Sequence, residues 1–245
     1  MWRQPSQAGE APQVLVRTGK SSNGSRAVAQ QSESRKHAPQ PSPQPRGERS
    51  HGRGAQSRVI RVIGGAMRGR RWRFPDIPDV RPTPDRVRET LFNWLGPRIV
   101  GARCLDLFAG SGALGLESLS RGASTVVFVE QHAAIARALG ALMTEWKVQG
   151  AVVSRTDAFS YLRGTPQPFD IVFLDPPFAA GLLAPAATLL EEKGWLAPDA
   201  LIYMESAARE TRPALPGAWV ERKAKHAGLV GYHLFARNPG VAVPE

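Results

Sequence analysis

Residues 104–115 combine an acidic side chain with a glycine-rich turn. Apolar residues lead to Asp106, and Gly110, Gly112 and Gly115 follow at the spacing of the dinucleotide-binding fingerprint. This pattern predicts a β-strand that feeds the N-terminus of a helix in an open α/β sheet, where a nucleotide-like cofactor can bind. The fingerprint does not by itself say which cofactor that is.

Charge decides between the candidate cofactors. A pyrophosphate on the helix N-terminus would be repelled by Asp106, and no Lys or Arg occurs from residue 105 to residue 120. S-adenosylmethionine carries a sulfonium and an ammonium group and no phosphate, so it fits this stretch better than NAD. The alternative is a plain turn in which Asp106 only caps the helix.

A second acidic motif ends the apolar run of residues 171–174. It consists of Asp175, Pro176, Pro177 and Phe178. The prolines fix φ and lack an N–H, so the turn is stiff and its carbonyl groups are free to accept hydrogen bonds. Such a turn can hold a flat base whose amino protons go to Asp175 and the Pro176 carbonyl, with Phe178 stacked on the ring. The alternative is a proline-rich strand exit with a packed Phe178; two acidic motifs at strand ends favour the base-binding interpretation.

The elements that must position these residues alternate along the chain. Strands are expected at residues 104–108, 125–130, 151–155, 171–175, 201–205, 220–225 and 232–236. Helices are expected after the first, second and fourth of them, up to about residues 121, 147 and 193. This alternation predicts a parallel sheet with helices on both faces and a terminal hairpin. The active site is expected where the strand order reverses, over the carboxyl ends of the first and fourth strands.

Acidic residues also stand at other strand ends. Glu130 is placed to accept the ribose hydroxyls of a cofactor, and the alternative is a helix-capping acid. Glu205 follows a later strand, where a structural role is favoured over a supporting role at the site. No metal site is expected, because the five His residues are scattered and Cys104 has no Cys or His at ligand spacing.

Positive charge is concentrated ahead of the sheet. The chain of 245 residues has a formal charge of +11, of which residues 1–57 carry +6, residues 58–90 carry +5 and the remainder is neutral. A basic front before a neutral domain indicates a polyanionic substrate such as RNA. A solvated charge run is the alternative, above all for residues 1–57.

Residues 59–63 and 68–74 predict two strands joined at a Gly-Gly turn. In the second strand arginines alternate with Trp72 and Phe74, which suggests an RNA grip by phosphate contacts and stacking. The alternative, with the aromatic rings packed on the domain, is nearly as good for Trp72. A helix is expected over residues 85–95, with the Thr83 hydroxyl near one end. The candidate RNA-binding residues are Arg68, Arg70, Arg71, Arg73, Arg81 and Arg86.

The composition sets further limits. Residues 1–57 are rich in Gln, Ser, Pro, Gly and Arg, a composition that predicts a disordered tail. Three explanations of this tail stay open: an RNA-contacting segment, a start codon assigned too early, or an organellar transit segment. A single cysteine excludes an intrachain disulfide and fits the cytoplasm. No apolar run approaches the ~20 residues of a membrane span.

Together these motifs resemble class I S-adenosylmethionine-dependent methyltransferases that act on exocyclic amines. More closely, the chain resembles the bacterial 16S rRNA guanine-N2 methyltransferases of the RsmD family. The closer match is carried by residues 61–65, 81–95 and 194–197, and the resemblance covers residues 58–237. It implies a Rossmann-like fold with a mostly parallel seven-stranded sheet, and methyl transfer to N2 of guanine 966 in the assembled small subunit.

The resemblance also implies site residues and boundaries. In similar methyltransferases an Asp at the place of Asp157 bonds the adenine amino group, although here it could simply cap the next helix. The expected domains are residues 1–57, 58–98 and 99–240, in a protein expected to be monomeric. The expected cofactor-binding residues are Asp106, Phe108, Gly110, Ser111, Gly112, Glu130, Asp157 and Ala158.

Two rival functions stay open. The first is another methyltransferase, acting on guanine N2 of tRNA or adenine N6 of DNA, although no segment is large enough for a separate DNA-reading domain. The second is a non-catalytic RNA-binding assembly factor on a methyltransferase scaffold. Asp106, Glu130 and Asp175 disfavour this second reading, because a scaffold without activity would not need all three acids.

Overall fold

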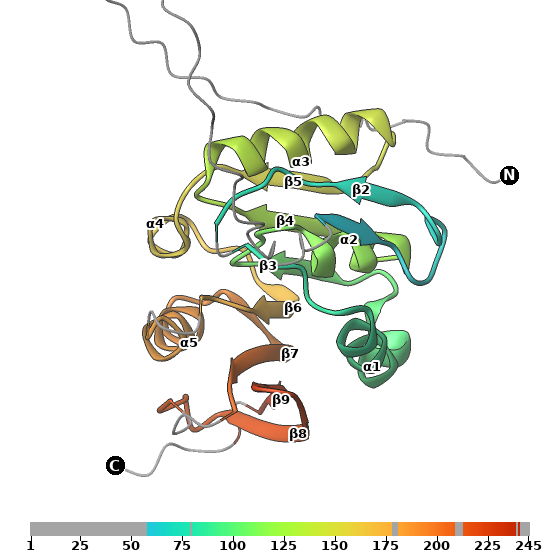
Figure 1. Ribbon diagram of the computed structural model, residues 1–245. Coiled ribbons are helices and arrows are strands. Elements are labelled where there is room, and N and C mark those ends of the chain that lie inside the picture. Colours follow the sequence, from blue (N-terminus) through green and yellow to red (C-terminus); the bar gives the residue numbers. More distant parts are fainter. Residues whose placement is uncertain (1–57, 79, 178–180, 209–212, 239, 241–245) are drawn as a thin grey trace, which may run out of the picture. The chain divides into compact units, whose positions relative to one another are not determined.

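A seven-stranded sheet forms the centre of the structure, a computed structural model (Figure 1). The strand order is β5-β4-β3-β6-β7-β9-β8. The strands are β3 (Arg103–Asp106), β4 (Thr125–Val129), β5 (Ala151–Ser154), β6 (Phe169–Leu174), β7 (Leu196–Ala207), β8 (Trp219–Ala227) and β9 (Val230–Arg237). Strands β3 to β7 are parallel, and β8 and β9 are antiparallel, which confirms the mostly parallel sheet predicted from the sequence.

The structure describes residues 58–78, 80–177, 181–208, 213–238 and 240. All of them belong to one structural unit, residues 57–245. The tail predicted at residues 1–57 lies outside the described residues, and so does Phe178 of the second acidic motif. The boundary expected between residues 98 and 99 stays a prediction.

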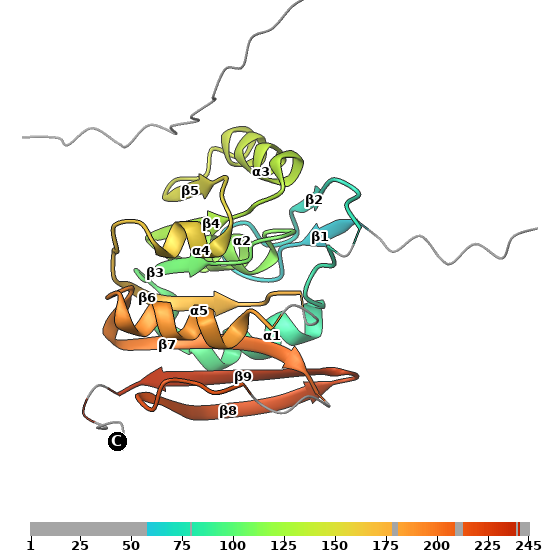
Figure 2. The ribbon, with the colours of Figure 1, turned by 90° about the vertical axis from the view of Figure 1, so that its left-hand side faces the viewer.

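Helices cover both faces of the sheet, as the alternation predicted (Figures 1 and 2). One face carries α1 (Asp85–Leu95), the short 3-10 helix η1 (Gly96–Ile99), α2 (Ala113–Ser120) and α3 (Ala133–Glu145); the other carries α4 (Ala158–Leu162) and α5 (Leu183–Glu192). Because central parallel strands are buried on both faces, they read as continuous apolar runs. In β3, for example, Cys104 and Leu105 point to opposite faces and both are fully buried.

A two-stranded hairpin, β1 (Val59–Arg61) and β2 (Arg71–Arg73), precedes α1. Its strands are shorter than predicted because the backbone after β1 turns toward α2: the N–H groups of Ile63 and Gly64 donate to the Glu117 carboxylate and not to a partner strand. Gly65 has φ +74, and a Cβ there would lie 1.8 Å from the Ser120 carbonyl oxygen. The turn can therefore approach α2 this closely only with glycine.

The strand order reverses beside β3. From β3 the chain proceeds outward through β4 and β5, whereas β6 lies on the other side of β3 and leads to β7. Ligands of open α/β sheets bind outside the carboxyl ends of the strands at such a switch point. Asp106 is the last residue of β3, and Asp175 directly follows β6, so the topology brings both acidic motifs to this point.

Candidate active site

The turn after β3 is organised around Asp106. Its carboxylate is buried, with 3% exposure, and Oδ2 accepts a hydrogen bond from the Gly115 N–H at 3.0 Å. Gly112, the N-cap of α2, has no side chain to fill this role, so Asp106 caps the helix from the preceding strand. Among the described residues no hydrogen bond reaches Oδ1 of Asp106, so its lone pairs stay available to a ligand.

Glycines allow α2 to lie against its neighbours. Gly112 has φ +73, and a Cβ on it would lie 2.6 Å from the Leu139 side chain. A Cβ on Gly115 would lie 2.2 Å from the Phe128 ring of β4. The spacing of these glycines thus serves the turn and the close packing of helix on strand, whichever ligand the turn holds.

Glu130 follows β4 and faces the same turn. Its Oε2 accepts from the Gly110 N–H at 2.7 Å, and its Oε1 accepts from the His132 N–H at 2.6 Å. The carboxylate thereby ties the glycine turn to the residues before α3. Neither of these two N–H groups belongs to a helix, so these contacts do not support the capping alternative. Because each carboxylate oxygen can accept two hydrogen bonds, the ribose contact stays a prediction beside this role.

Asp175 lies half-buried at the end of β6 and meets a residue from far upstream. The Thr83 hydroxyl, just before α1, donates to its Oδ2 at 3.3 Å. The sequence placed this hydroxyl near one end of the helix, and the structure brings it to the carboxylate expected to hold the base. Pro176 is buried and Pro177 is exposed, whereas the stacking expected of Phe178 falls on a residue outside the described ones.

Burial raises the pKa of the carboxyl groups at the switch point. Burial raises the pKa of Asp106 to about 7, against the Gly115 hydrogen bond, and the charges of Asp175 and Glu130 raise it further. Burial also raises the pKa of Asp175 to about 6 and raises that of Glu130. No ion pair joins these three to a cation in the described part of the chain. Such a pocket favours a positively charged ligand and disfavours a phosphate.

The remaining cofactor candidates are placed less distinctively. Asp157 is exposed and caps α4, its Oδ1 accepting from the Ser160 N–H at 2.9 Å; hydrogen bonds from Ser160 lower its pKa. This is the capping alternative, and a contact with adenine stays a prediction. Ser111 and Ala158 are buried, and Phe108 is half-buried.

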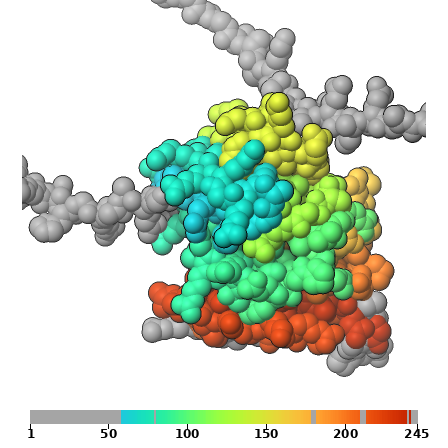
Figure 3. All heavy atoms as spheres, turned by 90° about the vertical axis from the view of Figure 1, so that its right-hand side faces the viewer, coloured from blue at the N-terminus to red at the C-terminus, as the bar shows by residue number. Residues whose placement is uncertain are grey.

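The hairpin separates its arginines from its aromatic rings. Trp72 is 7% and Phe74 2% exposed, and both belong to the core that contains Ile60 and α1. The prediction that these rings stack on RNA is wrong, because side chains alternate along a strand and this side of β2 faces the core. The arginines at the predicted RNA-contacting positions are all exposed: Arg68, Arg70, Arg71, Arg73, Arg81 and Arg86. Figure 3 shows the hairpin segment (cyan) at the surface.

One aromatic ring does lie among the hairpin arginines, and the sequence did not point to it. The Arg70 guanidinium carbon lies 5.2 Å from the centre of the Trp146 ring, at the end of α3, which is consistent with a cation–π contact. Trp146 is half-buried. The contact joins residues 76 positions apart, so no local pattern could reveal it.

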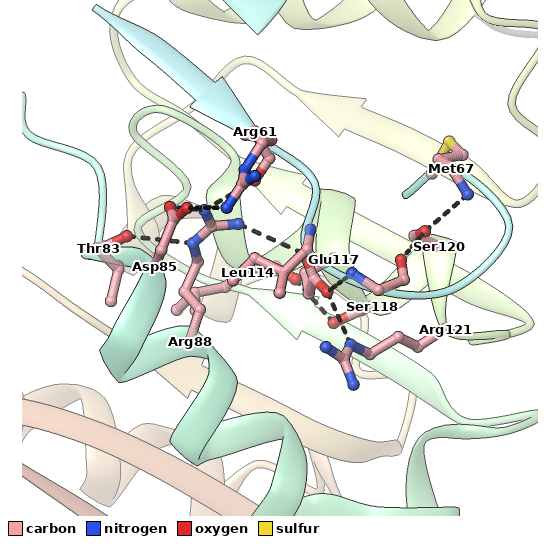
Figure 4. Close-up of polar contacts among 12 residues, drawn as sticks. Arg61, Met67, Thr83, Asp85, Arg88, Leu114, Glu117, Ser118, Ser120 and Arg121 are labelled. Carbon is pink, nitrogen blue, oxygen red and sulfur yellow. Dashed lines mark hydrogen bonds and ion pairs between the residues drawn. The ribbon is translucent and has the colours of Figure 1, made fainter. Parts of the chain in front are cut away.

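A buried ion-pair cluster centred on Glu117 was also missed from the sequence (Figure 4). Glu117 accepts from the Ile63 and Gly64 N–H groups, both at 2.8 Å, and from Arg121 Nε at 2.7 Å. Arg88, only 1% exposed, lies 3.4 Å away through Nη1. An acid within a helix of small residues and an arginine beside the apolar face of α1 were the available signals. The cluster fastens the hairpin and α1 to α2.

The described residues contain no candidate membrane span and no candidate metal site. No helix there is long and apolar enough to cross a membrane. No group of three or more His, Cys, Asp or Glu side chains there is arranged to hold a metal ion.

Comparisons with known proteins agree with this fold. The family model described as conserved hypothetical protein 95 matches residues 60–236. Ribosomal RNA small subunit methyltransferase D of Escherichia coli (strain K12) is 50% identical over 179 residues, 73% of this chain and 90% of that protein. The protein of the same name from Haemophilus influenzae is 42% identical over 181 residues, 72% of this chain and 93% of that protein.

Solved structures give the same result. One from Escherichia coli is 48% identical with a TM-score of 0.68, covering 74% of this chain and 98% of that chain. An RNA methyltransferase from Salinibacter ruber is 14% identical with a TM-score of 0.51, covering 66% and 97%, and shares the fold alone. The Rossmann-like class I methyltransferase fold implied by the resemblance is therefore confirmed. With a family model over most of its length and relatives 42% and 50% identical, the chain belongs to the ribosomal RNA small subunit methyltransferase D (RsmD) family.

Proposed function

We propose that this chain transfers a methyl group from S-adenosylmethionine to the exocyclic N2 amine of guanine 966 in 16S rRNA. The observation that carries the proposal is the pair of carboxyl groups at the switch point. Asp106 and Asp175 stand at the ends of adjacent strands, and neither forms an ion pair with a cation of the described chain. Family membership supplies the kind of RNA.

The donor side of the pocket suits a cationic cofactor. When bound, S-adenosylmethionine supplies an electrophilic methyl group on a sulfonium. Asp106 keeps one oxygen for its ammonium group, and Glu130 keeps lone pairs for its ribose. Gly110 and Gly112 allow the positive φ angles of the turn between them. Burial strengthens these contacts, because a charge-assisted hydrogen bond is stronger in a medium of low dielectric constant.

Asp175 and the Pro176 carbonyl hold the base on the acceptor side. The lone pair of an exocyclic amine is delocalised into the ring, so its nitrogen is a weak nucleophile. Two acceptors fixed on a stiff turn orient the amine and favour the more tetrahedral geometry of attack. Positioning and the exclusion of water then supply most of the rate enhancement, with no covalent enzyme intermediate.

The substrate is the small subunit in assembled or assembling form. Exposed arginines on the β1–β2 hairpin offer phosphate contacts, which fix position but do not read sequence. Selection of the base then falls to the pocket, so the target guanine must already be displayed in a loop. A folded ribosomal particle in the cytoplasm provides that display to a monomeric enzyme.

The test gives purified protein and labelled S-adenosylmethionine to small subunits, protein-free 16S rRNA, tRNA and duplex DNA in parallel. We expect label mainly in the small subunit, as N2-methylguanosine at position 966 by nucleoside mass spectrometry. Label mainly in tRNA, or as N6-methyladenine in DNA, would contradict the proposal. Cofactor binding without transfer to any RNA would favour an assembly factor.

A further inference from the structure

Glu205 is a buried carboxyl group that the proposed reaction does not yet use. It lies near the end of β7 with 4% exposure. Strands β6 and β7 are parallel, and their last paired residues are Leu174 and Met204. One residue further along each strand stand Asp175 and Glu205. Residues at matching positions of adjacent parallel strands face the same side of the sheet, so the two carboxyl groups are neighbours.

Two hydroxyl groups connect this pair. The Tyr203 hydroxyl, two residues earlier on the same face of β7, donates to Glu205 Oε1 at 2.7 Å. The Thr83 hydroxyl donates to Asp175 Oδ2 at 3.3 Å and also interacts with Glu205. Thr83 is itself buried, with 6% exposure, and its carbonyl accepts from Arg88 Nε at 3.1 Å. The order of contacts is therefore Tyr203, Glu205, Thr83 and Asp175.

We propose that Glu205 is a positioning residue for methyl transfer: acting through the Thr83 hydroxyl, it fixes the Asp175 carboxyl group in the orientation that receives the amine of the base. This inference rests on the proposed function, because Asp175 is taken to hold that amine. The Thr83 hydroxyl contacts both Glu205 and Asp175, so the effect of Glu205 passes through Thr83 to Asp175.

One proton between the two carboxyl groups makes this arrangement directional. Burial and the charge of Asp175 raise the pKa of Glu205 to about 8, whereas burial raises that of Asp175 to about 6. The two carboxyl groups titrate as a pair, and Glu205, the more deeply buried of the two, is the member that burial favours in the protonated form. A protonated Glu205 can donate to the Thr83 oxygen, which leaves the Thr83 hydrogen for Asp175.

The described groups around Glu205 supply no counter-charge to it. Tyr203 lies beside it on β7, and burial raises the pKa of this phenol, which stays a neutral donor. Tyr232 of β9 is its register partner, and Lys225 of β8 is the partner of Tyr232, one strand further away. On α1, which covers this face, the Arg88 guanidinium is bound to Asp85 and Glu117. No ion pair to Glu205 is present among the described residues.

The experiment measures kcat and KM on small subunits, cofactor affinity by calorimetry, and folding by circular dichroism. Thr83→Val keeps the side-chain shape and removes the hydroxyl, so we expect kcat to fall about 10–100-fold with cofactor affinity within about twofold, the usual effect of losing a supporting hydrogen bond. Thr83→Ser restores the hydroxyl and should restore most of kcat. Glu191→Gln is the control for losing an acid elsewhere. Glu191 lies on α5, and its carboxylate forms an ion pair with Arg237.

Glu205→Gln separates positioning from packing, because it keeps the shape but cannot ionise. In the wild-type protein kcat should fall above about pH 8, because Glu205 then loses the proton that it donates to Thr83. The ionised Glu205 also places a second negative charge beside Asp175. Glu205→Gln should lose this descending limb. Three outcomes would overturn the inference. They are a Thr83→Val variant with the kcat of the wild-type protein, a loss of kcat that Thr83→Ser does not restore, and a Glu205→Gln variant whose kcat still falls above about pH 8. Absence of transfer by the wild-type protein would instead overturn the proposed function, and this inference with it.

Discussion

Among the described residues, buried and half-buried carboxylates gather in two regions, and their charges are balanced differently. Around Glu117, two arginines and two backbone N–H groups surround one acid. At the switch point, the described residues give Asp106 one N–H and Asp175 one hydroxyl hydrogen, and the charge of Asp175 raises the pKa of Asp106. The first region is complete without a ligand, whereas the second has an excess of negative charge. An unbalanced buried charge is therefore the better indicator of a binding site.

The two regions are also connected. Arg88 lies in the Glu117 cluster through Nη1, and its Nε donates to the Thr83 carbonyl. The Thr83 hydroxyl in turn donates to Asp175. The Glu117 cluster thus holds the segment that contains Thr83, which donates to Asp175. Substitutions in the Glu117 cluster should mainly affect folding, and substitutions at the switch point should mainly affect turnover.

Removing the acid of the balanced region should have the largest effect. Glu117→Ala leaves Arg88 buried with one partner fewer and two backbone N–H groups without an acceptor, so we expect a loss of about 3–5 kcal/mol in the free energy of unfolding. Urea denaturation followed by circular dichroism measures it. Glu192→Ala, an exposed acid on α5, is the control. A loss below about 1 kcal/mol would mean that the cluster does not hold the hairpin.

Removing the acid of the unbalanced region should spare folding and stop the reaction. Asp175→Ala should lower kcat by about 10²–10³-fold, the range for one lost electrostatic contact to the reacting group. Cofactor affinity should stay within about twofold, because the expected partner of Asp175 is the base. Asp170→Ala removes an acid at the other end of β6, paired with Arg103, and should keep kcat. An active Asp175→Ala variant would make this loop structural.

The sequence predicted the two regions unequally. Asp106, Glu130 and Asp175 stand directly after apolar runs, and acids at the carboxyl ends of parallel strands must meet at one edge, so the site followed from local pattern and topology. The Glu117 cluster joins residues from the hairpin, α1 and α2, more than fifty positions apart for the Ile63 contact. No periodicity encodes such a contact.

The same limit explains the errors in the hairpin. Because arginines alternate with Trp72 and Phe74, the two kinds of side chain must face opposite sides of the strand, and the structure confirms this. This alternation does not fix which side meets the domain. The side that meets the domain is decided by the burial of the two rings in the core with Ile60 and α1. This burial depends on how α1 packs on the sheet, which the hairpin sequence does not contain.

A charge-removing change at Asp106 should weaken the cofactor by a smaller amount. Asp106→Asn keeps an oxygen for the Gly115 N–H but loses the charge, so we expect S-adenosylmethionine to bind about 1–3 kcal/mol more weakly. S-adenosylhomocysteine keeps the ammonium group that Asp106 is proposed to hold, so it should lose about as much affinity. Calorimetry with both compounds measures the losses, with Asp170→Asn as the control. An unchanged affinity for both compounds would show that Asp106 does not hold the ammonium group.

The smallest expected effect concerns pH and the protein without cofactor. Because the folded pKa of Asp106 is raised to about 7, the folded state holds a proton there that the unfolded chain has already released. The associated stability is present at low pH and is lost as pH rises through about 7. Between pH 6 and pH 7 the free energy of unfolding should therefore fall by about 1 kcal/mol from this group, and Asp106→Asn should remove that share of the slope. Urea titrations of both proteins at the two pH values test it; identical slopes would mean that Asp106 is ionised in the folded protein well below pH 6, and that the charge imbalance at the switch point is smaller than its burial implies.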